Sequence, residues 1–349
     1  FVQVINNYPI DPFYDYAYWK TDPSTYGTAW ELVAAPVARL AGDGFIATTI
    51  AFKLLAGSFL LLTLAALGGF LSHVARERAL TAVLLLAWNP IVLFESFGMG
   101  HNDFAMVLWL ILAAWAIAKR HYTLSILALA AGVLFKFIPL LLLPAAGLIG
   151  LRALPDARRR WQFMITAGIS SLALFVLVYL PFWNGWSTFT IGQRAGLYTT
   201  SLPAILYFIL QPSVGTALTG TILSSLALLV TVSFAIWQGW IAAQEPSWES
   251  FARAAYTILM FYLLLTCTWF QVWYPIWPLV VALLLPAGPS LNLALFFSLA
   301  MLPKQYVLFP ILYWGSTLPS TRLLREIYLF LWYLGPTWLA AIWTSLRSH

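Results

Sequence analysis

Charged residues are scarce in this chain. Asp, Glu, Lys and Arg together make up 9% of the 349 residues, whereas 62% are hydrophobic. A soluble globular domain carries about 25% charged residues, so that class of protein is excluded. Long apolar runs between short polar connections predict instead an all-α polytopic transmembrane protein with about ten hydrophobic segments.

Cysteine is nearly absent as well. The one cysteine, Cys267, excludes an intramolecular disulfide. The sequence also has no Walker loop, no dinucleotide-binding fingerprint and no His/Cys spacing typical of a metal site. A nucleotide-driven transporter is therefore not indicated. The chain begins at Phe1 without a signal-peptide pattern, and we expect that a segment precedes it.

Basic residues are concentrated in a few short connections. The net charge is +6, and Lys, Arg and His gather at 73–78, 119–121 and 152–160. Because basic connections favour the cytoplasmic side of a membrane, these clusters predict helix orientation rather than nucleic-acid binding. The segment before the first span should then lie outside.

Residues 1–44 mix polar and aromatic side chains, unlike the rest of the chain. Tyr and Trp rings favour the headgroup layer, and the prolines in this segment disfavour a spanning helix. We expect an external aromatic loop with a short interfacial helix over 26–40. This divides the chain into the loop at 1–44 and a transmembrane helical domain at 45–349.

The spans that follow can be ordered from their flanking charges. Residues 45–71 form a first full-length span, 79–97 return outward and 104–118 descend again. Residues 122–151 suit about one and a half passes, yet both of their ends are basic. A broken or re-entrant helix pair reconciles these two observations. The orientation of the last three segments stays open.

Lys136 lies near the middle of this apolar stretch, close to Pro139, which disfavours a continuous helix. A charge facing lipid is costly, so Lys136 should face a polar cavity. The alternative is a purely structural buried ion pair between Lys136 and Glu95.

A polar cluster at 98–103 separates the second span from the third. His101, Asn102 and Asp103 place an imidazole, an amide and a carboxylate side by side, after glycines that permit a tight turn. We expect this cluster on the external face. The alternative is that Asn102 or Asp103 only caps a helix that begins at Phe104.

Other candidate residues fall in the expected external loops. Asp11 and Asp15 lie in the first loop, and Arg194 is the one cation of a second loop at 183–201. A guanidinium suits bidentate contact with phosphate, although a single loop arginine is often just solvated. A third aromatic stretch occupies 269–278.

Several short motifs occur in a fixed order. They are Trp-Asn-Pro at 88–90, Phe-Glu at 94–95, Gly-His-Asn-Asp at 100–103, Lys-Phe-Ile-Pro at 136–139, and the weaker Asp-Pro-Phe at 11–13, Tyr-Gly at 26–27 and Trp-Tyr at 273–274. Together they resemble polyprenol-phosphate-sugar-dependent membrane glycosyltransferases of the GT-C class, especially the bacterial mannosyltransferase-like branch. The specific part of the resemblance covers residues 88–144.

The resemblance implies an inverting transfer of a sugar, mannose or another hexose, from a polyprenyl-phosphate donor to an acceptor at the external face of a bacterial plasma membrane. In such enzymes a carboxylate of the first external loop deprotonates the acceptor, while cationic groups stabilise the departing phosphate. That carboxylate usually follows a first membrane helix, and this chain begins without that helix. The base could therefore lie before Phe1 or be absent.

The resemblance also implies roles for individual residues. Asp103, with His101 and Asn102, matches the external motif and would position substrate, with Asp103 as a stand-in base. Lys136 would contact phosphate or hold the cavity together with Glu95. Asp11 and Asp15 are candidate bases by location, and Arg194 is a candidate phosphate ligand by charge alone.

The resemblance also implies which cofactors and partners to expect. No residue set requires a metal, although some related enzymes use a divalent one. The expected partners are membrane lipids, the lipid-linked sugar donor and a glycan, lipid or protein acceptor, with no nucleic acid.

Two other functions stay open. A lipid or solute transporter would need paired half-helices in two matching halves, and only one broken segment is evident here. An inactive structural subunit of a membrane complex is the second, because the first helix is missing. The enzyme hypothesis requires Asp103 and Lys136 to meet in one polar pocket open toward the outer leaflet.

Overall fold

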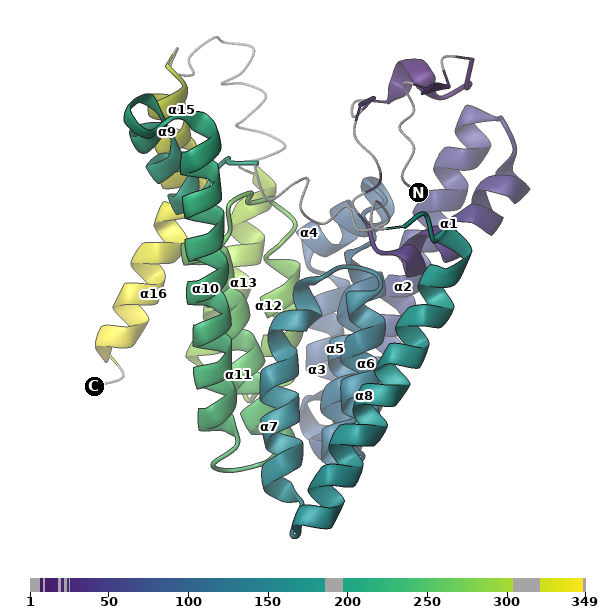
Figure 1. The fold of residues 1–349 in the computed structure, drawn as a ribbon, viewed down its shortest axis with the longest axis vertical. Coiled ribbons are helices and arrows are strands. Elements are labelled where there is room, and N and C mark those ends of the chain that lie inside the picture. Colours follow the sequence, from purple (N-terminus) through teal and green to yellow (C-terminus); the bar gives the residue numbers. More distant parts are fainter. Residues whose placement is uncertain are drawn as a thin grey trace.

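The computed structural model describes residues 7–8, 10–17, 20–21, 24, 26–185, 197–303 and 321–347. This part of the chain folds into 15 α-helices and short 3-10 and π-helical turns, with no β-strand. Most of the helices run along the long axis of the molecule, as Figure 1 shows. The predicted all-α fold is confirmed.

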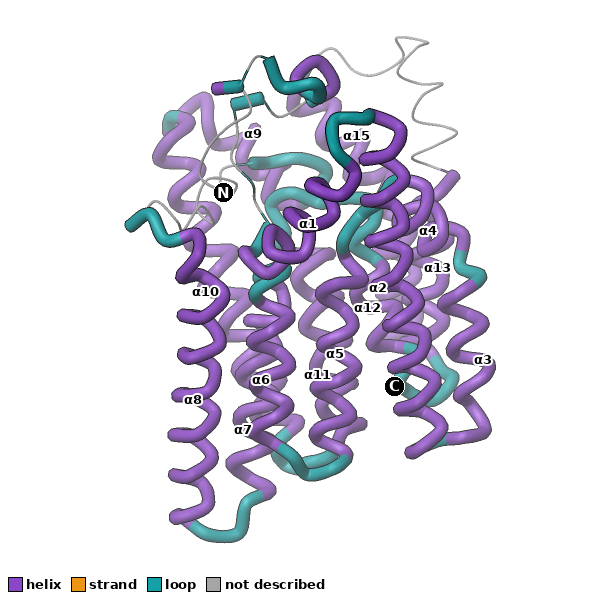
Figure 2. Tube along the Cα trace, turned by 90° about the vertical axis from the view of Figure 1, so that its right-hand side faces the viewer, coloured by secondary structure: helices purple, strands orange, loops and turns teal. Residues whose placement is uncertain are grey.

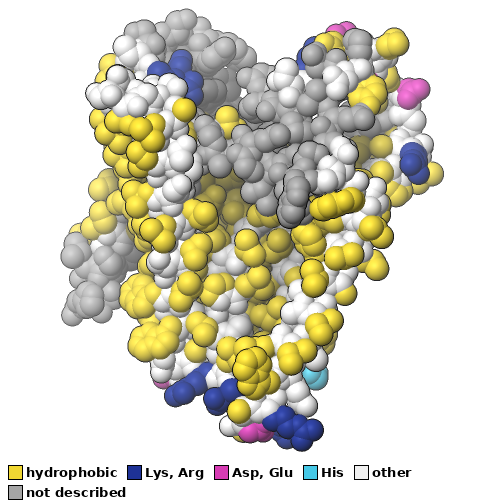
Figure 3. Space-filling view, viewed as in Figure 1, with side chains coloured by type: hydrophobic (Ala, Val, Ile, Leu, Met, Phe, Trp, Pro, Cys, Tyr) yellow, Lys and Arg dark blue, Asp and Glu magenta, His cyan; other side chains and the backbone are white. Residues whose placement is uncertain are grey.

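Three helices of the described part are long and apolar enough to cross a membrane. They are α2 (Phe45–Val74), α8 (Ala157–Tyr179, continued to Phe182) and α10 (Thr216–Ala242). At about 1.5 Å per residue, each exceeds a hydrocarbon core of roughly 30 Å. The outward faces of α8 and α10 carry apolar side chains that are visible in Figure 3, and α2 likewise has exposed apolar side chains. Such faces suit lipid, and the chain is a membrane protein.

The second predicted span is bent. Helix α3 (Arg76–Ala87) is followed by α4 (Pro90–Leu93) and the π-helical turn η3 (Phe94–Gly98), at an angle of 58° to α3. The bend falls at Asn89, whose side chain accepts a hydrogen bond from the backbone N–H of Ile91, just before a proline at the first helical position. Proline suits that position because its nitrogen has no hydrogen to donate.

The stretch at 122–151 forms the predicted re-entrant pair. Helix α6 (Tyr122–Val133) rises beside α5 (Asp103–Ala118), the turn η4 (Ile138–Leu142) reverses the chain, and α7 (Leu143–Ala153) returns. The 12 residues of α6 reach only about 18 Å, which is too short for a complete crossing. Both basic flanks therefore lie at one end of the molecule.

The remaining helices of the described part complete the bundle and its two ends (Figure 2). They are α1 (Thr28–Ala41), α9 (Leu202–Val214), α11 (Trp248–Phe261) with η7 (Tyr262–Thr266), α12 (Ile276–Ala282), α13 (Pro289–Pro303), α15 (Arg322–Tyr333) and α16 (Gly335–Arg347). All seven residues of α12 are buried, and this helix packs against α5 and α11. It therefore lies in the core.

The N-terminal segment contributes the short turn η2 (Tyr14–Tyr16) and α1. The rings of Phe13 and Tyr16 pack against Phe45 at the start of α2, and α1 packs against α2 and α8. The helix predicted at 26–40 is thus present, while the division at residue 44 stays a prediction.

The two ends of the bundle differ in charge. Lys and Arg side chains gather at the lower end of the view in Figure 3, where α7 connects to α8. The α5–α6 connection, with Lys119 and Arg120, lies at the same end because α5 and α6 run antiparallel over similar lengths. Asp103 and the turn after α6 lie at the opposite end.

Candidate functional site

Asp103 and Lys136 meet at the end of the bundle opposite the basic connections. The Lys136 Nζ lies 2.7 Å from Asp103 Oδ2. The other carboxylate oxygen, Oδ1, accepts a hydrogen bond of 2.6 Å from Trp277 Nε1 on α12. The side chain of Asp103 is 1% exposed and that of Lys136 is 15% exposed. Both carboxylate oxygens are therefore engaged, whereas the lysine side chain is mostly buried with a small exposed part.

Local structure explains how these groups come together. Asp103 is the first residue of α5, where a carboxylate is favoured by the positive end of the helix dipole. Lys136 follows the end of α6, and its backbone N–H still bonds to the Gly132 carbonyl at 3.0 Å. Because α5 and α6 pack along each other, the start of one helix meets the end of the other.

A second pair, Glu95 and His101, lies in the turn before α5. The His101 Nδ1 lies 2.8 Å from Glu95 Oε2, which is ion-pair distance without the in-line geometry of a hydrogen bond. The glutamate side chain is 1% exposed and the histidine side chain 19%. Gly100 makes this return possible because its φ of +79° is a conformation that favours glycine. The His101 N–H bonds to the Glu95 carbonyl at 2.8 Å and fixes the turn.

These contacts correct one of the two expectations for Lys136. The alternative that Lys136 pairs with Glu95 is wrong, because Asp103 is the carboxylate at its ammonium. The π-helical turn carries Glu95 beside His101 instead.

Asn102 lies between the two pairs in sequence and does not act as a helix cap. It occupies the N-cap position of α5, but its side chain makes no capping hydrogen bond. The residue is 3% exposed, and neither Oδ1 nor Nδ2 has a hydrogen-bond partner among the described residues. A buried amide without partners costs about 1–3 kcal/mol. A ligand would reach these two buried atoms only after the surrounding side chains move.

Aromatic rings from distant segments surround these polar groups. The Lys136 Nζ lies 5.5 Å from the centre of the Tyr26 ring, within the range of a cation–π contact. The His101 ring stacks on Trp273 at 3.8 Å, and Tyr274 stacks on Trp277 at 4.1 Å. The predicted aromatic stretch at 269–278 thus joins the cluster.

A close backbone contact places Tyr26 beside Lys136. The Gly27 N–H donates to the Phe135 carbonyl and the Ala29 N–H donates to the Leu134 carbonyl, each at 3.0 Å. A Cβ atom at Gly27 would lie 1.9 Å from the Leu134 oxygen. Only glycine therefore fits at position 27 without moving the backbone.

Two charged residues, Lys53 and Glu326, were not predicted from the sequence as part of the site. Lys53 lies on α2, and its side-chain stem packs near Gly100, at 3.7 Å from where a Cβ atom would stand. A lone lysine inside an apolar span could have indicated this position, because a charge facing lipid is costly.

Glu326 on α15 is 1% exposed, lies 3.0 Å from Arg322 Nε and accepts a 2.7 Å hydrogen bond from the Thr200 N–H. It sits in a polar stretch of the sequence, which gave no sign of its burial.

Glu326 helps to hold the aromatic segment in place. Thr199 forms a bridge with Trp269, donating its N–H to the Thr268 carbonyl at 3.1 Å and accepting from the Phe270 N–H at 3.3 Å. Glu326 therefore braces the backbone from which the chain continues to Trp273.

The other candidate residues are not brought to the cluster. Asp11 accepts a hydrogen bond from the Phe13 N–H in its own turn, and Asp15 lies exposed on η2. Among the described residues, neither carboxylate bonds to Lys136 or His101. Arg194 lies outside the described residues. Within the described ranges, no three His, Cys, Asp or Glu side chains form a group able to hold a metal ion.

The fold and this cluster define a polytopic helical membrane protein with a buried ionic and aromatic site. Residues 14–152 match the model of the MptA_B family, described as alpha-(1->6)-mannopyranosyltransferase, N-terminal domain. The match includes Asp15, Tyr26 and both ion pairs, but not Asp11 or the aromatic stretch at 269–278. It confirms the resemblance to mannosyltransferase-like GT-C proteins and supports glycosyltransferase activity in general.

The match covers less than half of the chain. Neither the comparison with curated proteins nor the comparison with solved structures gave a match.

Proposed function

We propose that the chain transfers a mannosyl residue from a polyprenyl-phosphate donor to an acceptor at the external face of a bacterial plasma membrane, with inversion at the anomeric carbon. One observation carries this proposal. Two partly exposed groups, Lys136 and His101, are each backed by a carboxylate that is 1% exposed. An inverting transfer needs one group to stabilise a departing anion and another to take a proton.

Lys136 is suited to the departing phosphate. Its ammonium pairs with Asp103 and lies 5.5 Å from the centre of the Tyr26 ring, and its side chain is 15% exposed. A fixed cation stabilises negative charge that develops on a leaving group without reorganising during the reaction. The carboxylate of Asp103 also limits the cost of burying the lysine before the donor binds.

His101 is suited to the acceptor hydroxyl. Its Nδ1 lies 2.8 Å from Glu95 Oε2. Once this contact becomes an in-line hydrogen bond, the Nε2 atom is left to accept a proton, in the way that a buried carboxylate orients a catalytic histidine. Asp103 would serve as the base only if its contacts with Lys136 and Trp277 opened. We therefore assign Asp103 the positioning of Lys136.

The surrounding side chains suit a hexose. Trp273 and Tyr26 offer apolar ring faces, and the buried amide of Asn102, which has no partner among the described residues, would bind a hydroxyl once neighbouring side chains move aside. Sites for small polar ligands combine such apolar walls with a few directed polar groups. The mannosyltransferase family match favours mannose among the hexoses.

The charge distribution supports an external site. Lys119 and Arg120 follow α5, and the 16 residues of this helix raise Asp103 by about 24 Å above them. With the basic end in the cytoplasm, the Asp103 cluster comes near the outer edge of the hydrocarbon core. A polyprenyl chain could then stay in the membrane while its phosphate reaches Lys136.

The experiment is sugar transfer by the full chain in lipid nanodiscs, with polyprenyl-phosphate-mannose as donor and a mannoside acceptor. Lys136→Gln is expected to lower the rate by about 10²–10³-fold, because a fixed charge at the leaving group is lost. Lys119→Gln removes an exposed lysine at the opposite end and serves as the matched control. Transfer by Lys136→Gln at the wild-type rate would overturn the assignment, and absence of transfer by the wild type would favour a structural subunit.

The base is tested by His101→Gln under the same conditions. The expected loss is about 10²–10⁴-fold, together with the disappearance of the histidine limb from the pH profile of the rate. Because a positioning role would lower the rate without changing the profile, the profile decides between the two. The anomeric configuration of the product, read by NMR, tests inversion.

A further inference from the structure

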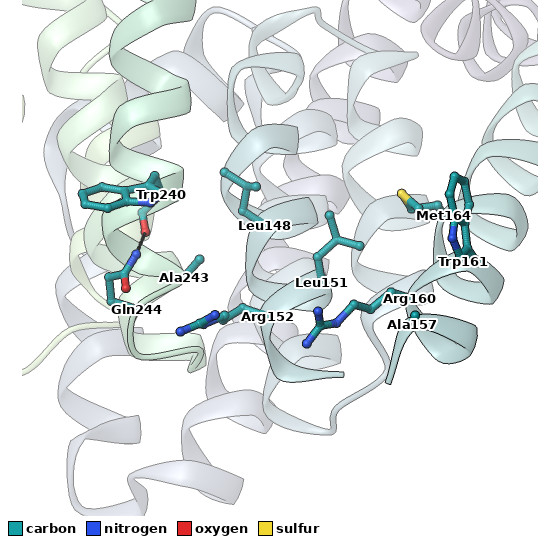
Figure 4. A pocket seen from close by; sticks show the side chains of 10 residues that line it. All are labelled: Leu148, Leu151, Arg152, Ala157, Arg160, Trp161, Met164, Trp240, Ala243 and Gln244. Atoms are coloured by element: carbon teal, nitrogen blue, oxygen red, sulfur yellow. Dashed lines mark hydrogen bonds between the residues drawn. The ribbon is translucent and has the colours of Figure 1, made fainter. Parts of the chain in front are cut away.

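A cavity lies at the basic end of the bundle, far along the helices from the Asp103 cluster. It has a volume of about 590 Å³ and is bounded by α7, α8 and α10 (Figure 4). The residues that line it are Leu148, Leu151, Arg152, Ala157, Arg160, Trp161, Met164, Trp240, Ala243 and Gln244. Figure 1 shows α7 between the two longer helices, so α7 forms the floor and α8 and α10 form the walls.

The walls of this cavity are apolar, and the cavity opens toward the lipid-facing surface. Trp161 on α8 is 62% exposed and Trp240 on α10 is 58% exposed. They stand on opposite sides, with Leu148 and Leu151 between them (Figure 4). Because tryptophan favours the boundary between hydrocarbon and headgroups, this arrangement fits the surroundings of an acyl chain near its polar end.

Two arginines stand at the lower rim of the cavity, side by side below the leucines in Figure 4. Arg160 uses its Nε to donate to the Leu154 carbonyl at 3.0 Å, which fixes its stem and leaves its terminal nitrogens available. Within the described part of the chain, no carboxylate pairs with Arg152. The cavity thus has a doubly cationic rim over an apolar interior.

Two carboxylates lie next to lining residues in the sequence, Asp156 at the start of α8 and the exposed Glu245 after Gln244, and neither lines the cavity. Asp156 accepts a hydrogen bond from the Arg159 N–H at the start of α8, and its Oδ2 lies 3.5 Å from Arg159 Nε. Neither Asp156 nor Arg159 lines the cavity. Arg158 adds further positive charge to the same connection. The local charge therefore attracts an anion.

We propose that this cavity binds an anionic glycerophospholipid, with the phosphate between Arg152 and Arg160 and an acyl chain along α7. Guanidinium groups recognise phosphate through paired N–H donors, and basic pockets between membrane helices bind anionic headgroups. An inorganic anion would use the rim but not the apolar walls. A zwitterionic lipid carries the same phosphate, but its headgroup also bears an ammonium that the two arginines repel, so it should bind more weakly. The lipid would brace α7, which continues through η4 to Lys136.

The test measures lipid binding and does not depend on transferase activity. The full chain in detergent is titrated with phosphatidylglycerol and with phosphatidylcholine, and bound lipid is counted by native mass spectrometry. We expect about tenfold tighter binding of phosphatidylglycerol, and loss of this preference in Arg152→Gln/Arg160→Gln. Arg158→Gln/Arg159→Gln removes the same charge outside the cavity and should keep the preference.

Three results would overturn the proposal: no preference in the wild type, an unchanged preference in the cavity variant, or equal loss in both double variants. Arg152→Gln alone removes no hydrogen bond or ion pair of the described residues, so it covers the case in which the double variant fails to fold. We expect Arg152→Gln to bind phosphatidylglycerol more weakly than the wild type does. An unchanged affinity in this variant would also overturn the proposal. Displacement of the lipid by excess inorganic phosphate would indicate an anion site instead.

Discussion

The carboxylates of the N-terminal loop and those of the Asp103 cluster have the same chemistry but different surroundings. Asp15 lies exposed on a surface turn, and Asp11 bonds within its own turn. Asp103 and Glu95 are each 1% exposed and each face a cationic or ionisable partner. A carboxylate in water costs nothing to keep charged, whereas a buried one persists only with partners. The carboxylates of the N-terminal loop and those of the Asp103 cluster therefore differ most clearly in burial and in the presence of a charged or ionisable partner.

The largest expected effect comes from removing half of the buried pair. Asp103→Leu leaves the Lys136 ammonium buried without its carboxylate, and we expect a loss of about 3–5 kcal/mol in the free energy of unfolding. Lys136→Met leaves the carboxylate unpaired and should cost a similar amount. The measurement is thermal unfolding in one fixed detergent.

The double variant Asp103→Leu/Lys136→Met sharpens this test. Replacing both charges by apolar side chains should restore most of the stability, because neither is left unpaired. Sugar transfer should remain lost. A double variant as unstable as either single one would show that the two residues act independently.

The next effect concerns the backbone contact that holds Tyr26 near the pair. Gly27→Ala would place a Cβ atom 1.9 Å from the Leu134 oxygen, so we expect a loss of about 1–3 kcal/mol in unfolding free energy. Gly147→Ala is the matched control, because no atom lies within 4 Å of its added Cβ and the residue is inside α7. There the change should be neutral or stabilising by about 0.5–1 kcal/mol. Equal behaviour of both variants would contradict the close contact.

The smallest effect is expected at the carboxylates of the N-terminal loop. Asp11→Asn and Asp15→Asn should each change the unfolding free energy by no more than about 0.5 kcal/mol, as surface substitutions usually do. With His101 as the base, sugar transfer should stay near the wild-type rate. A large loss of transfer at unchanged stability in Asp15→Asn would move the base to the N-terminal loop and leave His101 a positioning role.

Much of the helical framework could be predicted from residue order alone. The apolar run at 45–71 became α2, and the basic flanks of 122–151 correctly indicated a pair that turns back. The length of an apolar run sets how far a helix reaches, and the charge of its flanks sets which end it faces. Both quantities are local, so they can be read along the chain.

The contacts of the site were only partly accessible in this way. The cluster at 101–103 and Lys136 could be singled out because charges inside apolar runs are costly. For Lys136 the sequence left two partners open, and the structure brings it to Asp103, as the enzyme hypothesis required, rather than to Glu95. Lys53 and Glu326 were missed because the packing around a residue, rather than its neighbours in sequence, decides its burial.

The sequence by itself determined that this protein is helical, lies in a membrane and turns back at Lys136. Only the tertiary structure decided that Asp103 meets Lys136 from 33 residues away and Trp277 from 174 residues away. The physical reason is that the apolar pattern determines which face of a helix is buried. It does not determine which other helix packs against that face. Partner choice depends on how side chains of the whole bundle fit together.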